Sequence, residues 1–333
     1  MHLHLKLRAA TLLFIIALNA KAQDTRVLIK EGILLSNDKN YTAAIAKFKL
    51  ALTSEPDNPS ANYQLAFTLN ASGKAAEAVP YLQRATASDS ATAITGAAYA
   101  LLGSIYDRTN QPQKAIQNLK SAIKINPGDH LLHYNLGLVY FRTRDYAGAE
   151  NSAVNALKFA PHHPGSMRLY ALVTFHQNKR APALLALCQF LWLDPKGGKS
   201  AEAYGNLQSI LSGGVLKPEP GLKPLNANNR ALNDIIAKAA RSASAKKYAT
   251  ATDKLTGQLK EVFEGIGLLT AKQSGNDSVS TVLAARYYAL SKTTHLPVYT
   301  QIISQGSAPT AATWLKTNQQ KVSAIREWYA VAK

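Results

Sequence analysis

Small and bulky apolar residues recur along the first part of the chain with a period of 34 residues, and Pro127, Pro161 and Pro195 close three successive units. Ahead of these prolines, equivalent positions hold the same residue types, as in Leu102 and Leu136, Gly103 and Gly137, Tyr106 and Tyr140, Ala115 and Ala149, and Ala122 and Ala156. A repeat of this length is typical of helical hairpins that stack on one another. The pattern therefore predicts pairs of antiparallel helices.

Three of the five units follow the pattern less strictly. Their matching residues are Gly32, Ala44, Phe48, Ala51 and Pro56 in the first, Leu65, Ala66, Leu69, Ala78, Leu82 and Ala85 in the second, and Tyr170, Ala171, Ala183 and Leu187 in the fifth. Small residues let two helices approach closely, bulky residues three or four positions away fill the seam, and proline ends the second helix. Residues 92–95 shift the register by three, which predicts a longer loop between the second and third units.

The sequence Leu-Gly-x-x-Tyr, present at Leu102–Tyr106 and Leu136–Tyr140, resembles the tetratricopeptide repeat family. The resemblance covers residues 25–197, about half of the chain. It implies an all-α helical-repeat solenoid of about five repeats. It also implies that the protein binds a protein or peptide partner in a concave groove, without catalysing a reaction.

In this family the first helix of each unit lines the groove, so the resemblance also implies which residues face a partner. These residues are Tyr63, Phe67, Asn70, Ser104, Asp107, Arg108, Tyr134, Leu138, Phe141, Arg142, Arg168 and Phe175, with Leu172 and His176 beside them. An aromatic groove with arginines at its edge suits an amphipathic helix or an extended peptide that carries acids. For Tyr63, Phe67, Tyr134 and Phe141, packing against the neighbouring repeat is an equal alternative. The family's clamp for a C-terminal carboxylate is not expected, because Ile29 and Ile33 stand at its positions in the first unit.

After Pro195 the repeat signature stops, but helical periodicity continues. Residues 198–229 are expected to form one helix, over 200–211, and a linker rich in proline and glycine. Residues 230–333 are expected to form a helical C-terminal domain, with two helices over 231–269 and four over 279–292, 296–305, 309–318 and 319–331. Ser278 is a candidate N-cap for the first of these four, and Pro309 suits the first turn of another. The domain is a candidate cap for the apolar end of the solenoid.

The N-terminus is typical of a secretory signal peptide, residues 1–22. Lys6 and Arg8 precede an apolar run that is too short to span a bilayer, and Ala20-Lys21-Ala22 forms a small-x-small cleavage site. Cleavage after Ala22 would leave Gln23 as the first residue, and we expect a periplasmic or secreted protein. A membrane-retained helix is the alternative. No later run is apolar enough to predict a transmembrane segment.

The chain has 333 residues and a formal net charge of +18, and the excess is uneven. Residues 23–195 hold 17 basic and 12 acidic residues, whereas residues 196–333 hold 18 and 8. A basic C-terminal half could meet an anionic envelope polymer or lipid surface, although scattered lysines on solvated helix faces explain the same charge. Export makes nucleic acid the least expected anion.

We find no sequence signature of catalysis, of a cofactor or of a metal site. The single cysteine, Cys188, lies in the apolar stretch 184–193 and is expected to be a buried, inert thiol. His130, His133, His162 and His163 stand at the starts of two neighbouring repeats, where imidazoles could converge on a metal. The favoured interpretation of these four residues is that they are solvent-exposed histidines at helix starts, and no metal is predicted. The leading hypothesis is an exported interaction scaffold; an adaptor to anionic envelope surfaces is the alternative.

Overall fold

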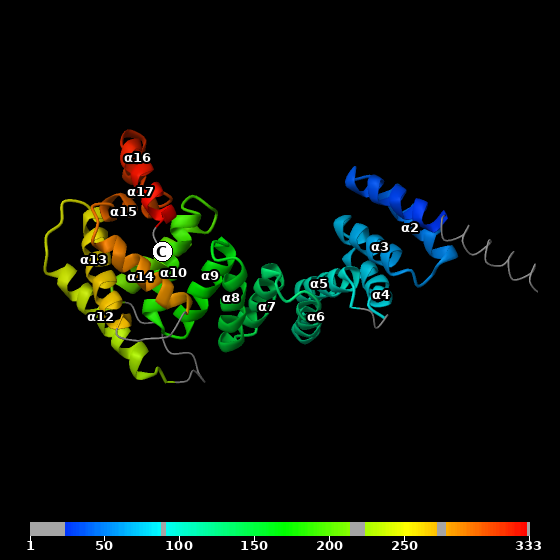
Figure 1. The fold of residues 1–333 in the computed structure, drawn as a ribbon, viewed down its shortest axis with the longest axis horizontal. Coiled ribbons are helices and arrows are strands. Elements are labelled where there is room, and N and C mark those ends of the chain that lie inside the picture. Colours follow the sequence, from blue (N-terminus) through cyan, green and yellow to red (C-terminus); the bar gives the residue numbers. More distant parts are fainter. Residues whose placement is uncertain (1–23, 88–90, 214–223, 272–277, 332–333) are drawn as a thin grey trace, which may run out of the picture. The chain divides into compact units, whose positions relative to one another are not determined.

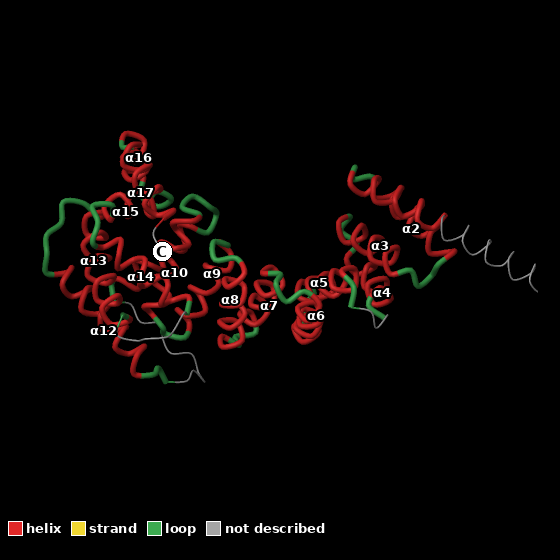
Figure 2. Tube along the Cα trace, in the orientation of Figure 1, coloured by secondary structure: helices red, strands yellow, loops and turns green. Residues whose placement is uncertain are grey.

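The computed structural model describes residues 24–87, 91–213, 224–271 and 278–331, and these residues form helices joined by turns and loops, without a strand (Figures 1 and 2). The prediction of an all-α helical-repeat solenoid is confirmed. The predicted signal peptide, residues 1–22, lies outside the described residues, as do residues 217–223 of the linker rich in proline and glycine.

The repeats form a regular series of helix pairs. Residues 24–37 are helical and are followed by α2 (Tyr41–Ser54), α3 (Pro59–Ala71), α4 (Ala75–Ala85), α5 (Ala93–Arg108), α6 (Pro112–Ile125), α7 (His130–Arg142), α8 (Tyr146–Phe159), α9 (Pro164–His176) and α10 (Arg180–Leu193). Helix α11 (Ser200–Leu211) then occupies the place of a sixth first helix. Local signals set the starts of several of these helices. The side chains of Asn40, Asn58 and Asp145 accept hydrogen bonds from backbone amides of the first turns of α2, α3 and α8.

The first helix of every unit ends in the same way. The second residue after its last turn has a positive φ: Lys39, Gly73, Asn110, Arg144, Asn178 and Gly213. This left-handed residue closes a helix C-terminus, and in the third unit the Gln111 amide donates back to the Tyr106 carbonyl at 2.8 Å. The interval from Gly73 to Asn110 is 37 residues instead of 34, which confirms the predicted three-residue insertion. The interval from Asn178 to Gly213 is 35 residues, so the turn recurs once beyond the predicted repeats.

The chain divides into two compact units, residues 1–139 and 140–333. In unit 1, paired helices pack through small residues such as Ala44, Ala51 and Ala78, all of which are fully buried. Gly103 on α5 allows the close approach of α6, because a Cβ at this position would lie 2.6 Å from the Leu119 Cγ. The small residues of the repeat therefore set the helix spacing, as the sequence predicted.

The C-terminal half forms α12 (Ala227–Ser244), α13 (Ala251–Thr270), α14 (Val279–Ser291), α15 (Leu296–Ser304), α16 (Pro309–Thr317) and α17 (Gln319–Val331). These bounds confirm the predicted helices to within a few residues. The Ser278 side chain accepts from the Thr281 amide and caps α14, and Pro309 opens α16. A new helix starts where a cap or a proline in its first turn stands, so local sequence determined these boundaries.

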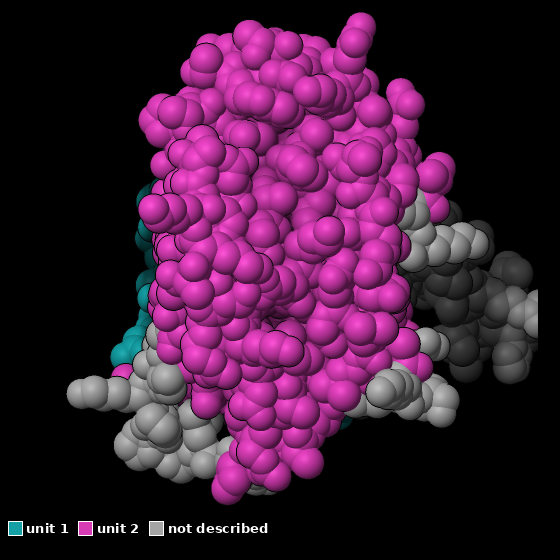
Figure 3. All heavy atoms as spheres, turned by 90° about the vertical axis from the view of Figure 1, so that its left-hand side faces the viewer, with its two compact units in different colours: residues 1–139 teal, residues 140–333 magenta. Residues whose placement is uncertain are grey.

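Helix α10 is the centre of unit 2. Every residue from Arg180 to Leu191 is buried, and α10 packs against α9, α11, α12, α14 and α15. A helix that is apolar on all sides must be covered on all sides. The described residues of 140–333 therefore form one compact unit (Figure 3), which contains both the last repeats and the helices expected for the C-terminal domain.

Asn233 links α12 to the turn between α9 and α10 by hydrogen bonds. Its side chain accepts from the Arg180 amide at 2.9 Å and donates to the Asn178 carbonyl at 2.8 Å, so it bonds both sides of the turn between α9 and α10. Three tyrosines, Tyr287, Tyr299 and Tyr329, reach α10 from α14, α15 and α17. Their hydroxyls donate to the Gln189 side chain and, for Tyr299, to the Cys188 carbonyl at 2.8 Å.

Candidate functional site

In unit 1 the predicted groove residues of α3 and α5 lie on two helices that pack against each other. Tyr63 and Phe67 are one turn apart on α3, and their ring centroids are 6.2 Å apart. Phe67 is 45% exposed and offers an apolar surface to solvent. Tyr63 is half-buried, and burial raises the pKa of its hydroxyl.

The polar residues of this surface connect the two helices. The Arg108 guanidinium at the end of α5 donates to the Asn70 side-chain oxygen at the end of α3. Ser104 lies one turn before Asp107 and Arg108 on α5, and Ser104 and Asp107 are both half-buried. Among the six residues predicted for the second and third units, the structure joins Tyr63 to Phe67 and Asn70 to Arg108. We call Tyr63, Phe67, Asn70, Ser104, Asp107 and Arg108 the α3/α5 surface.

The other predicted groove residues differ in their exposure to solvent. Tyr134 and Leu138 of α7 are half-buried in unit 1, and Arg142 is exposed in unit 2. The Phe141 ring packs edge-on against Tyr146 and His176, at 5.9 and 5.3 Å between ring centroids. This contact agrees with the alternative of packing against the neighbouring repeat.

Arg168 and Phe175 of α9 are engaged in the structure. Arg168 forms an ion pair with Glu202 of α11 at 2.9 Å, and these two residues are one repeat period apart. Phe175 was expected on a surface that faces a partner, but it is buried, with only 8% of its area exposed. The position of a residue in the repeat predicted which side of the helix it lies on. It did not predict how deeply the neighbouring helices bury that residue.

The histidines at the starts of the fourth and fifth units have local structural roles. His133 is buried, and its Nε2 lies 2.9 Å from the Pro127 carbonyl oxygen. The His163 Nδ1 accepts from the Ser166 amide and caps α9. Within the described residues, no group of three histidine, cysteine, aspartate or glutamate side chains is arranged to hold a metal ion.

Cys188 is fully buried in α10, as predicted, and burial raises the pKa of its thiol. A thiol in this setting is a poor nucleophile, because the thiolate is the reactive form. No helix in the described ranges is both long and apolar enough to span a membrane.

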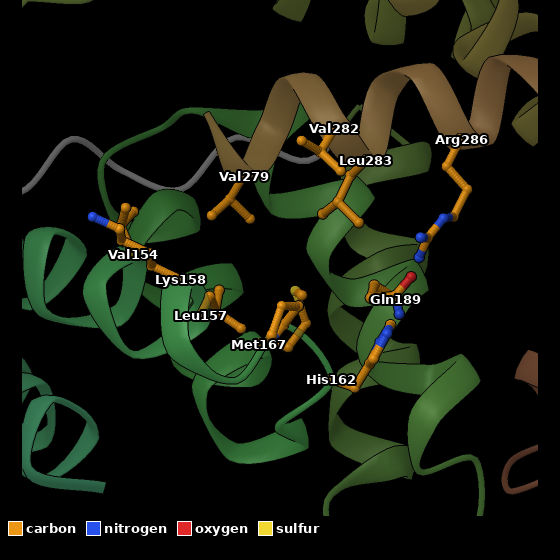
Figure 4. A pocket seen from close by; sticks show the side chains of 11 residues that line it. Val154, Leu157, Lys158, His162, Met167, Gln189, Val279, Val282, Leu283 and Arg286 are labelled. Atoms are coloured by element: carbon orange, nitrogen blue, oxygen red, sulfur yellow. The ribbon is translucent and has the colours of Figure 1, made fainter. Parts of the chain in front are cut away.

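Sequence reasoning missed a cavity in unit 2. It has a volume of about 550 Å³ and is lined by residues of α8, α9, α10 and α14 and of the loop before α9 (Figure 4). Helices α8 and α14 are more than a hundred residues apart in the sequence, so no local pattern could predict that they meet around a cavity.

The sequence matches two models of the tetratricopeptide repeat, over residues 57–127 and 100–164. No curated protein matches it. Among solved structures, the chain is similar to the MamA protein, with 22% identity, a TM-score of 0.48 and coverage of 54% of this chain and 96% of that one.

Two other solved structures are similar. One is YrrB, described as a tetratricopeptide repeat protein with an unusual peptide-binding site, with 19% identity, a TM-score of 0.47 and coverage of 55% and 92% of the two chains. The other is PilF of Pseudomonas aeruginosa, with 16% identity, a TM-score of 0.45 and coverage of 81% and 99%.

Proposed function

We propose that this chain, whose residues 57–164 belong to the tetratricopeptide repeat family, is an exported, non-enzymatic scaffold that binds a peptide or helix of a partner protein. The observation that carries the proposal is the α3/α5 surface, where an exposed phenylalanine lies beside a tyrosine and a bonded Asn70–Arg108 pair. Helical repeats of this kind supply protein-binding surfaces rather than reaction centres.

The chemistry of the α3/α5 surface favours a partner with apolar and acidic residues close together. Phe67 and Tyr63 offer apolar contact area, and aromatic and arginine side chains contribute most of the binding energy at protein interfaces. Arg108 can keep its bond to Asn70 and still donate to a carboxylate, because a guanidinium carries five N–H groups. An amphipathic helix or an extended peptide with acidic residues meets both requirements.

A displayed library of random peptides, selected against the full chain, tests this proposal. We expect the enriched peptides to combine apolar with acidic residues, and Phe67→Ala to weaken their binding at least about tenfold. Leu50→Ala is the matched control, because Leu50 of α2 is 52% exposed in the same unit but lies outside the α3/α5 surface. Retained binding by Phe67→Ala, with circular dichroism unchanged, would exclude this surface.

An adaptor for anionic envelope polymers or lipids remains the second candidate, supported by the charge of residues 196–333. Binding of that kind must weaken as salt screens the charges. The test is binding of the full chain to anionic vesicles at about 50 and about 500 mM salt. Equal binding at the two salt concentrations would count against the adaptor function.

Export is part of the proposal and is supported by the basic, apolar and small-x-small order of residues 1–22. The mature protein isolated from its native cells is expected to begin at Gln23. Mass spectrometry of its N-terminal peptide measures this, and an intact Met1 would argue against cleavage.

A further inference from the structure

The cavity in unit 2 has an apolar body. Val279, Val282 and Leu283 of α14 line one side, and Leu157 of α8 and Met167 of α9 line the other (Figure 4). Leu157, Met167 and Leu283 are nearly fully buried, whereas Val282 is 48% exposed and lies where the cavity meets solvent. A volume of about 550 Å³ lies within the usual range for small-molecule sites.

One end of the cavity is polar and basic. Figure 4 shows Arg286 extending from α14 toward Gln189 of α10 and His162 of the loop before α9. Lys158 lines the opposite side of the cavity, beside Val154 (Figure 4), and none of the described lining residues is acidic. The Gln189 oxygen already accepts from Tyr287 and Tyr329, which fixes that side chain at the polar end.

Arg286 is partly buried without an anionic partner. Its Nε is shielded from solvent and has no hydrogen-bond acceptor, and no carboxylate of the described residues forms an ion pair with it. Its guanidinium carbon lies 5.1 Å from the centroid of the Tyr329 ring. The Nε itself is closed off from the cavity, but the guanidinium end of Arg286 points toward Gln189 and His162 (Figure 4). An anion bound beside that end would form charge-assisted hydrogen bonds with a cation that forms no ion pair among the described residues.

A second, smaller cavity of about 250 Å³ shares Arg286 and His162 with the first. It adds Arg326 of α17 and Trp192 of α10 to the same end. The polar end therefore has a second guanidinium within the adjoining cavity, whereas the opposite walls are aliphatic. Two guanidinium groups close together at one end and an aliphatic body are complementary to an anionic amphiphile.

We propose that this cavity binds a single-chain amphiphile with an anionic head group, either a fatty carboxylate or an alkyl phosphate. The head group is held by Arg286 and His162, and the aliphatic chain lies between α14 and the wall formed by Leu157 and Met167. The site lies in unit 2 and is independent of the α3/α5 surface in unit 1, so either proposal can fail without the other.

Titration calorimetry of the full chain with dodecanoate and dodecyl phosphate, each below its micelle-forming concentration, tests the site. Both head groups or one of them are expected to bind, and their relative affinity identifies the source of the anion. Dodecanol lacks the charge and acetate lacks the chain, so both are expected to bind at least about tenfold more weakly. Dodecanol binding as tightly as the anions would overturn the proposal. So would tighter binding of a peptide that ends in two leucines, because a protein C-terminus would then be the occupant.

Substitutions in the cavity test whether the ligand binds there. Arg286→Gln is expected to weaken binding of the anionic amphiphile at least about tenfold, whereas Arg241→Gln, the same change at an exposed position of α12, leaves it unaltered. If Arg286→Gln disturbs folding, Val282→Glu provides the second test, because it sets a repelling carboxylate at the exposed mouth. Its control is Leu268→Glu on α13, which is 54% exposed and does not line the cavity. Unchanged affinity in a folded Val282→Glu protein would show that the ligand binds elsewhere.

Discussion

Two glycines show how the surroundings of a residue decide its role. Gly103 and Gly205 are 102 residues apart, and each lies inside a helix that precedes a turn of the repeat type, α5 and α11. A Cβ at Gly103 would lie 2.6 Å from the buried Leu119, whereas a Cβ at Gly205 would have no neighbour within 4 Å. The small residue is therefore needed for packing only where the second helix of the hairpin lies against it.

We predict opposite effects of the same substitution at these two glycines. Gly103→Ala should lower the free energy of unfolding by about 1–3 kcal/mol, because the added methyl group overpacks the seam between α5 and α6. Gly205→Ala should raise it by about 0.5–1 kcal/mol, because alanine is the better residue in an open helix interior. Urea unfolding followed by circular dichroism measures both. Changes of the same sign would contradict the structural distinction.

At the scale of the element, helix α10 explains what the sequence could and could not predict. The C-terminal helices were predictable because Ser278, Pro309 and similar caps act within a few residues. Their packing on α10 was not predictable, because the contacts join distant parts of the chain, such as the Tyr299 hydroxyl and the Cys188 carbonyl, 111 residues apart. The same reason applies to Phe175, whose burial depends on its neighbours, and to the cavity around Arg286. The α3/α5 surface was predictable because the repeat fixes which residues share a helix face.

The tyrosines on α10 predict a loss of stability in alkali. Burial raises the pKa of Tyr287, Tyr299 and Tyr329, so the folded protein keeps their protons at a pH where the unfolded chain releases them. The unfolded phenols titrate near pH 10, and above that pH the unfolded state binds fewer protons than the folded state. The contribution of these tyrosines to the free energy of unfolding is complete below about pH 10. The free energy of unfolding then falls as the pH rises further.

Tyr299→Phe separates this effect from general alkaline damage. At neutral pH the variant should be less stable by about 1 kcal/mol, because it loses the hydrogen bond to the Cys188 carbonyl. Above about pH 10 its stability should fall less steeply than that of the wild type, since one titrating group is gone. Urea unfolding at a series of pH values between 8 and 11 gives the two curves. Parallel curves would mean that Tyr299 does not contribute to the pH dependence.

At the scale of the whole molecule, the compact units do not follow the limits of the repeat. The division after residue 139 falls inside α7, within the fourth unit, and the helices beyond the repeats belong to the same body as α8 to α10. The end of a helical solenoid exposes an apolar face that must be covered. In this chain α12, α14 and α15 cover α10, so the C-terminal half is part of the structure that stabilises the last repeats.

Cleavage between the repeats and the C-terminal helices tests this unity. A protease site inserted between Gly213 and Pro224 should, after cleavage, leave two fragments that elute together in gel filtration, because the interface on α10 is built from fully buried side chains such as Tyr287, Tyr299 and Leu184. The fragments should separate in denaturant. Burying such side chains contributes about 1.5–3 kcal/mol each, so an association through several of them survives the loss of one peptide bond. An independent C-terminal domain, as the linker alone would predict, would instead elute separately at its own size without denaturant. That outcome would show that the contacts on α10 are too weak to hold the two halves together.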